Sequence, residues 1–187
     1  MFSLRLHFNP DSGVSEKSNV RWNPETNLDQ LGDVGVILLH LCKDFRESGK
    51  IAFQVSGFGE DSWPVDVSTD LATIAEQLPA LCKFISSPAE PMTHLDFYEQ
   101  GVERYLTLNR RESEIEVTCL STSQWQPNPR TETIHWDLFR SMIYTFYRTF
   151  VAAATLISPR LASHTMFQEW IKDIERLMPT SGRTGHK

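Results

Sequence analysis

Strict alternation of apolar and polar residues most constrains what this chain can fold into. It is clearest at the start, where Leu4, Leu6 and Phe8 alternate with polar residues. A two-residue period predicts a strand with one apolar and one polar face, so a core can cover only one face of the resulting sheet. Five segments have this pattern: residues 3–8, 51–56, 95–98, 102–108 and 114–120.

Four other segments space their apolar residues as helices do. Pro79 lies inside the second of them and predicts a kink or two abutting helices. Residues 109–112 predict a hairpin loop, and residues 124–133, with two prolines, predict irregular structure. The helical segments are residues 28–48, 71–85, 134–157 and 167–178.

The order of these segments is strand, helix, strand, helix, three strands and two helices. Short connections between neighbouring strands predict a mostly antiparallel sheet with helices packed on one face, which is an α+β fold. The chain of 187 residues is long enough for a full core, and no linker divides it. We therefore expect a single domain over residues 1–178, followed by a disordered tail over residues 179–187.

The composition indicates an ordinary globular protein rather than a nucleic-acid binder. The formal net charge is -6, whereas binding to phosphates requires basic residues. No signal peptide is visible, and the most hydrophobic stretch, residues 134–157, contains Asp137, Arg140 and Arg148, so we expect a cytoplasmic protein. Cys42, Cys82 and Cys119 lie in apolar runs, which predicts buried, reduced thiols.

Negative charge is concentrated in the middle of the chain. Residues 60–103 hold nine acidic residues and one basic residue, a sum of -8. One interpretation is a solvated face that keeps the protein soluble. The other is a surface for a basic partner, in which carboxylates steer the encounter and tyrosines supply contact area. The candidate partner-binding residues are Glu60, Asp61, Asp66, Asp96, Tyr98, Glu99, Glu103, Tyr105, Glu114 and Glu116.

No motif for catalysis or metal binding is present. The six histidines are scattered, and neither an H-E-x-x-H nor a C-x-x-C motif occurs. The sequence therefore predicts no catalytic residue, no metal, no cofactor and no enzymatic activity. Trp22, Trp63 and Trp125 lie in expected loops, where each either closes an edge of the core or contacts a partner.

Four stretches together resemble a known group of proteins. They are the turn Phe8-Asn9-Pro10-Asp11-Ser12-Gly13, the helix entry from Trp63 to Leu71, residues 95–104 and the long aromatic helix ending at Ser158-Pro159. Through these stretches the chain resembles, over residues 2–178, the bacterial immunity proteins of polymorphic toxin and contact-dependent growth inhibition systems. The resemblance implies a small cytoplasmic α+β protein that binds and blocks a cognate toxin. These motifs are structural, so no binding residue is carried over.

The favoured function is therefore neutralisation of a toxin by occlusion of its active site. The acidic residues would meet the basic surface of the toxin, which we expect to be a nuclease. The alternative is a small-ligand or enzyme pocket between sheet and helices. In that case Arg104, a charge in the apolar row of Val102, Leu106 and Leu108, would line the pocket unless it is ion-paired or faces an edge.

Overall fold

The computed structural model describes residues 1–11 and 32–178, and these form the expected α+β fold. The predicted tail at 179–187, and Trp22, lie outside the described residues. The strands are β1 (Ser3–Phe8), β2 (Ile51–Ser56), β3 (Met92–Phe97), β4 (Arg104–Arg110), β5 (Glu114–Ser121) and β6 (Thr131–His135). The helices are α1 (Val34–Ser48), α2 (Asp70–Ser86), α3 (Trp136–Ile157), α4 (Pro159–Ala162) and α5 (Thr165–Leu177).

The strands form two antiparallel sheets rather than the single sheet expected. β1 pairs only with β2, and the other sheet has the order β3-β4-β5-β6. The outward residues of β1 and β2, such as Arg5 and Gln54, therefore do not share a face with those of β3 to β5. The two-residue period predicts strands but contains no information on which strands become neighbours.

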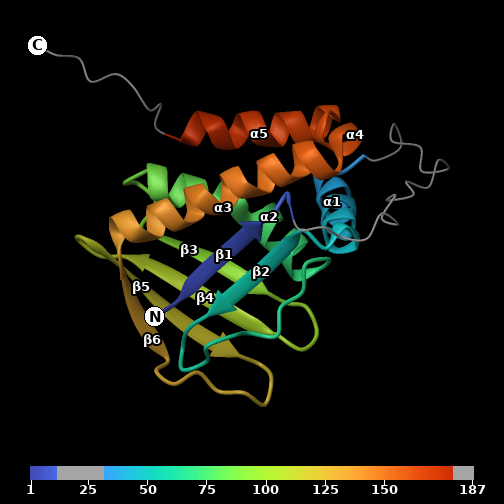
Figure 1. The fold of residues 1–187 in the computed structure, drawn as a ribbon. Coiled ribbons are helices and arrows are strands. Elements are labelled where there is room, and N and C mark those ends of the chain that lie inside the picture. The colour runs from blue at the N-terminus through green and yellow to red at the C-terminus, as the bar shows by residue number, and fades with distance from the viewer. Residues whose placement is uncertain (12–31, 179–187) are drawn as a thin grey trace, which may run out of the picture.

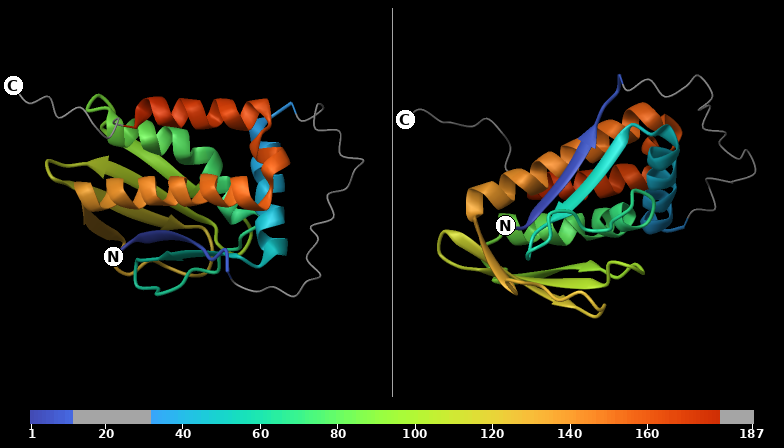
Figure 2. Two further views of the ribbon diagram at one scale, coloured as in Figure 1. Left: turned by 45° about the horizontal axis from the view of Figure 1, so that its top comes forward. Right: turned by 60° about the horizontal axis from the view of Figure 1, so that its bottom comes forward.

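All the helices lie on one side of the four-stranded sheet, which leaves its other face uncovered (Figures 1 and 2). α2 packs next to this sheet, and α3 packs along β1. The two-stranded sheet of β1 and β2 lies on the same side of the four-stranded sheet as the helices (Figure 2). The expectation of helices on one face is thus confirmed.

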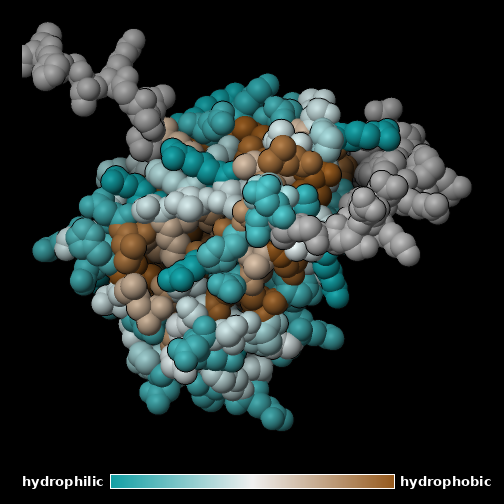
Figure 3. All heavy atoms as spheres, in the orientation of Figure 1, coloured by the Kyte–Doolittle hydropathy of each residue, from teal (hydrophilic) through white to brown (hydrophobic). Residues whose placement is uncertain are grey.

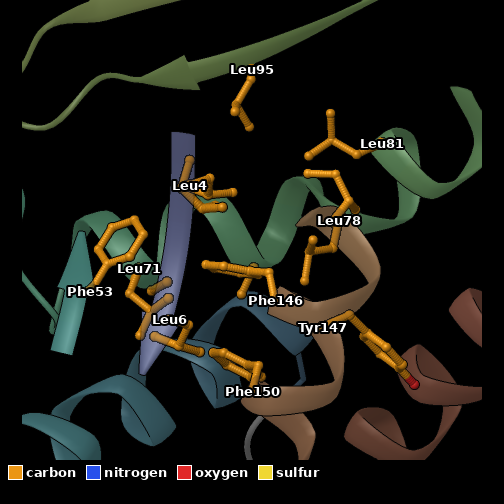
Figure 4. Packing of buried hydrophobic residues seen from close by; sticks show 14 of the residues in the cluster. Leu4, Leu6, Phe53, Leu71, Leu78, Leu81, Leu95, Phe146, Tyr147 and Phe150 are labelled. Carbon is orange, nitrogen blue, oxygen red and sulfur yellow. The ribbon is translucent and has the colours of Figure 1, made fainter. Parts of the chain in front are cut away.

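A single hydrophobic core joins both sheets to the helices. Leu4 and Leu6 of β1 face the same interior as Leu78 of α2 and Phe146 of α3 (Figure 4). The apolar rows of the four-stranded sheet are fully buried, as their alternation predicts. These rows are Leu95 and Phe97, Leu106 and Leu108, and Ile115 and Val117.

Several predicted boundaries are wrong. β3 runs from Met92 to Phe97 instead of over residues 95–98, and β4 begins at Arg104 instead of residue 102. Residues 131–135 form β6 instead of irregular structure followed by a helix, and α3 begins only at Trp136. The main-chain hydrogen bond from the Cys119 N–H to the Arg130 C=O (2.9 Å) continues the pairing with β5. This pairing, which the sequence of residues 124–133 does not indicate, makes the segment a strand. α2 continues past Pro79 as one helix. Among the described helices, none is long and apolar enough to cross a membrane.

Candidate functional site

A groove of 280 Å³ lies between the first turns of α1, the first half of α2 and the loop after β3. We call it the acidic groove, because three of its lining residues are carboxylates and none is basic. The exposed ring of Tyr98, 58% accessible, forms part of the wall. The groove is lined by Asp33, Gly35, Val36, Leu39, Thr69, Ala72, Thr73, Glu76, Tyr98 and Glu99.

The helices α1 and α2 position two of the carboxylates. Asp33 is the N-cap of α1, and its Oδ1 accepts a hydrogen bond from the Gly35 N–H at 2.8 Å. Glu76 of α2 approaches the same turn so closely that a Cβ on residue 35 would lie 2.6 Å from Glu76 Oε1. Gly35, which weakens the first turn of α1 in propensity, thus leaves room for the carboxylate.

The carboxylates of this region repel one another. Burial and the charge of Asp33 raise the pKa of Glu76 above its ordinary value. Nearby, at the start of α2, burial together with the charges of Asp66 and Glu99 raises the pKa of Asp70 to about 6. The region therefore holds more negative charge than its own residues neutralise, and a cation from outside would relieve the repulsion.

Of the ten predicted site residues, only Tyr98 and Glu99 line this groove. Asp66, at the start of α2, makes internal hydrogen bonds instead. Its Oδ1 accepts from the Ser68 hydroxyl at 2.8 Å and the Thr69 N–H at 2.9 Å. Despite an opposing effect of burial, these bonds and those from the Ser68 N–H and the Thr69 hydroxyl lower the pKa of Asp66.

Glu60 is also used internally. A tight turn at residues 57–60, with positive φ at Phe58 and Gly59, directs it toward β4. Its Oε2 lies 2.6 Å from Arg104 Nη2, and the side chain of Arg104 is only 2% exposed. Glu60 therefore neutralises a buried arginine. The neighbouring Asp61 is exposed beside a separate hollow near Arg5.

Arg104 is enclosed by aromatic rings. Its guanidinium carbon lies 4.2 Å from the ring centroid of Trp63 and 3.6 Å from that of Trp125. Both tryptophans thus close the core over the charge. Arg104 is thus ion-paired, as one of the two interpretations has it, and the Trp63 and Trp125 rings lie against its guanidinium where the alternative interpretation placed a pocket.

The uncovered face of the four-stranded sheet gathers four further predicted residues, Asp96, Tyr105, Glu114 and Glu116. Two are partly engaged there. Glu116 forms an ion pair with Arg111 at 2.7 Å, and the ring of His94 stacks on Tyr105 with centroids 4.9 Å apart. Threonines separate the remaining charges, so this face is more weakly acidic than expected. Glu103 lies outside the strands, half-buried, with φ of 49°.

The three thiols are buried, as predicted. All three cysteines are free and buried. Burial raises the pKa of Cys82 to about 12 and of Cys119 to about 11, so neither is a ready nucleophile. Over residues 1–11 and 32–178, no group of three or more His, Cys, Asp or Glu side chains is placed to hold a metal ion.

Sequence reasoning did not identify Asp33 and Glu76 as site residues. Asp33 carries an N-cap signal just before an apolar run, but that signal indicates only where a helix begins. Glu76 lies on the polar side of a helical stripe, like any solvent-facing residue. Their proximity arises from the packing of α1 on α2. No known family model, curated protein or solved structure matches this chain.

Proposed function

We propose that this chain is an immunity-type binding protein that neutralises a cognate toxin by covering a basic surface of it. The acidic groove is the observation that carries the proposal. It combines three carboxylates, no basic lining residue and an exposed tyrosine. Such a groove suits a lysine or arginine side chain of a protein partner, with Tyr98 supplying contact area.

The repulsion within the groove supports a cationic ligand. In the free protein, burial and then the charge of Asp33 raise the pKa of Glu76, so its negative charge is disfavoured there. A guanidinium or ammonium group would remove this repulsion on binding. On a nuclease toxin the same basic residues would contact substrate phosphates, so binding would occlude the active site. The toxin assignment itself rests on the resemblance of residues 2–178 to immunity proteins.

The test uses the toxin domain encoded next to the gene for this chain. We expect coexpression of this chain to restore growth of cells that produce that domain. Glu76→Gln with Glu99→Gln should weaken the purified complex by about tenfold at low salt, because two charge pairs are lost. The expected result includes weaker binding of the wild type as salt rises.

Glu114→Gln with Glu116→Gln on the uncovered sheet face is the matched control, since it removes the same charge elsewhere. Equal losses in both double variants would indicate a general charge effect and contradict the groove as the contact site. A neighbouring gene without any toxin domain, or a toxin that kills cells despite coexpression, would contradict the immunity function.

A further inference from the structure

The two outer edges of the four-stranded sheet differ in how their main-chain groups are satisfied. At the β3 edge, the Gln77 side chain of α2 donates to the Asp96 C=O at 2.8 Å and accepts from the Asp96 N–H at 2.8 Å. A side-chain amide thus takes the place of a neighbouring strand. α2 contacts β3, and its Gln77 thereby blocks the pairing of a further strand at Asp96.

The β6 edge has no such cover. β6 bonds to β5 through its even-numbered residues, as the bonds from the Cys119 N–H to the Arg130 C=O and from the Trp136 N–H to the Ser113 C=O indicate, both 2.9 Å. Thr131 and Thr133 therefore direct their N–H and C=O groups away from the sheet. Both residues are exposed, and these four groups make no hydrogen bond with another described residue.

An apolar groove of 440 Å³ adjoins this edge on the side of the core. Ile134 belongs both to β6 and to the wall of the groove, and Leu138, 49% exposed, lies in the first turn of α3. Figure 3 shows the groove as a brown hollow between α3 and β1. Its other walls come from Met1 to His7 of the β1 segment and from Ser141, Met142, Thr145 and Phe146 of α3.

We propose that β6 accepts an extended segment of another protein as a fifth strand. Thr131 and Thr133 would each exchange two main-chain hydrogen bonds with it. The partner side chain opposite Ile134 would point to the core side and enter the apolar groove. This inference is independent of the acidic groove and adds a second contact surface.

The charges that line the apolar groove indicate which charge the bound segment should have. Arg5 and His7 line the groove, whereas no Asp or Glu does. Within the described residues, the exposed Arg5 side chain donates a hydrogen bond only to the Ser3 hydroxyl, and no described carboxylate forms an ion pair with it. The segment should therefore combine apolar side chains at alternate positions with a flanking carboxylate.

A second copy of this chain fits the edge poorly. Antiparallel pairing of two β6 strands about Thr133 places Glu132 of one copy opposite Ile134 of the other. The Glu132 side chain is 9% exposed and accepts the Phe58 N–H at 2.9 Å, so it cannot turn away without breaking the turn at residues 57–60. The arrangement would put a carboxylate beside an apolar groove.

The probe is a fluorescein-labelled peptide of sequence Asp-Thr-Val-Thr-Val-Thr-Asp with blocked ends. With the valines facing the core, the N–H groups of the threonines point at β6. The parent peptide should bind with a dissociation constant below about 1 mM and slow the hydrogen exchange of the Thr131 and Thr133 amides. N-methylation of the three threonines should abolish binding, whereas N-methylation of the two valines should preserve it.

Variants of the protein separate the groove from the strand edge. Leu138→Glu should weaken binding by at least about tenfold, because it puts a charge into the groove and repels the acidic flank. Leu156→Glu is the matched control on the same helix, at a side chain that is 66% exposed and outside the groove. Absence of binding by the parent peptide, or equal binding of its two methylated forms, would overturn the proposal.

Discussion

Two sets of carboxylates in this protein differ in whether other groups of the protein bind them. Glu60 and Asp66, at the start of the acidic stretch, are bound by the protein itself. Glu60 pairs with Arg104, and Asp66 accepts hydrogen bonds from Ser68 and Thr69, just before α2. Glu76 and Glu99, further along the same stretch, face the acidic groove without a basic neighbour in its lining. Charge density along a sequence therefore does not indicate which charges remain free for a partner.

The difference follows from what each carboxylate meets in the fold. Arg104 enters the core at the start of β4, where two tryptophans surround it, and a buried guanidinium requires a counter-charge. The acidic groove instead forms where the N-terminus of α1 meets the first half of α2. The N-terminus of α1 favours nearby carboxylates, so Asp33 and Glu76 can lie there without a basic side chain. Three predictions test this contrast in the free protein.

The largest effect should come from the internal ion pair. Glu60→Ala leaves Arg104 buried without a counter-charge, and we expect the free energy of unfolding in urea to fall by about 3 kcal/mol. Asp61→Ala, at the exposed neighbouring position, should change it by less than about 0.5 kcal/mol. If the two variants proved equally stable, Arg104 would not depend on Glu60.

The pH dependence of stability should reveal the repulsion near the acidic groove. The pKa of Asp70 is about 6 in the folded protein and 3.8 ordinarily, so the folded state binds this proton more tightly. The Asp70 contribution to stability is therefore greatest below about pH 4, decreases as the pH rises to about 6, and is then constant.

Asp70→Asn should remove this dependence and raise the stability at pH 7 by about 2 kcal/mol. Urea titrations of both proteins between pH 4 and 7 measure the difference. The amide oxygen can still accept the hydrogen bond that Asp70 Oδ2 receives from the Asp66 N–H at 2.8 Å. A constant difference between wild type and variant at every pH would contradict the raised pKa.

The smallest effect should come from the groove itself. Glu76→Gln removes repulsion with Asp33, and we expect a gain of about 0.3 kcal/mol at low salt that disappears in 1 M NaCl, where charges are screened at about 3 Å. Glu169→Gln, an exposed position on α5, should leave the stability unchanged. A loss of stability in Glu76→Gln would mean that favourable contacts of the Glu76 carboxylate outweigh its repulsion with Asp33.

The sequence by itself determined the local elements and the buried rows. A two-residue period, which depends only on neighbours along the strand, predicts the burial of Leu4 and Leu6 and of Ile115 and Val117. The α+β class and the antiparallel pairing follow from the order and spacing of such segments. The helix from residue 136 is likewise visible as a broad apolar arc, although its first residue is not.

Only the tertiary structure decided which distant residues meet. β1 pairs with β2, Glu60 with Arg104, and Asp33 approaches Glu76. In each case the two positions are more than 40 residues apart in the sequence. The partner of each strand edge is decided in the same way, since Gln77 bonds to Asp96 of β3 whereas no described residue bonds to the outer main-chain groups of Thr131 and Thr133 in β6. Periodicity describes which way a side chain points, but the packing of elements determines what it faces.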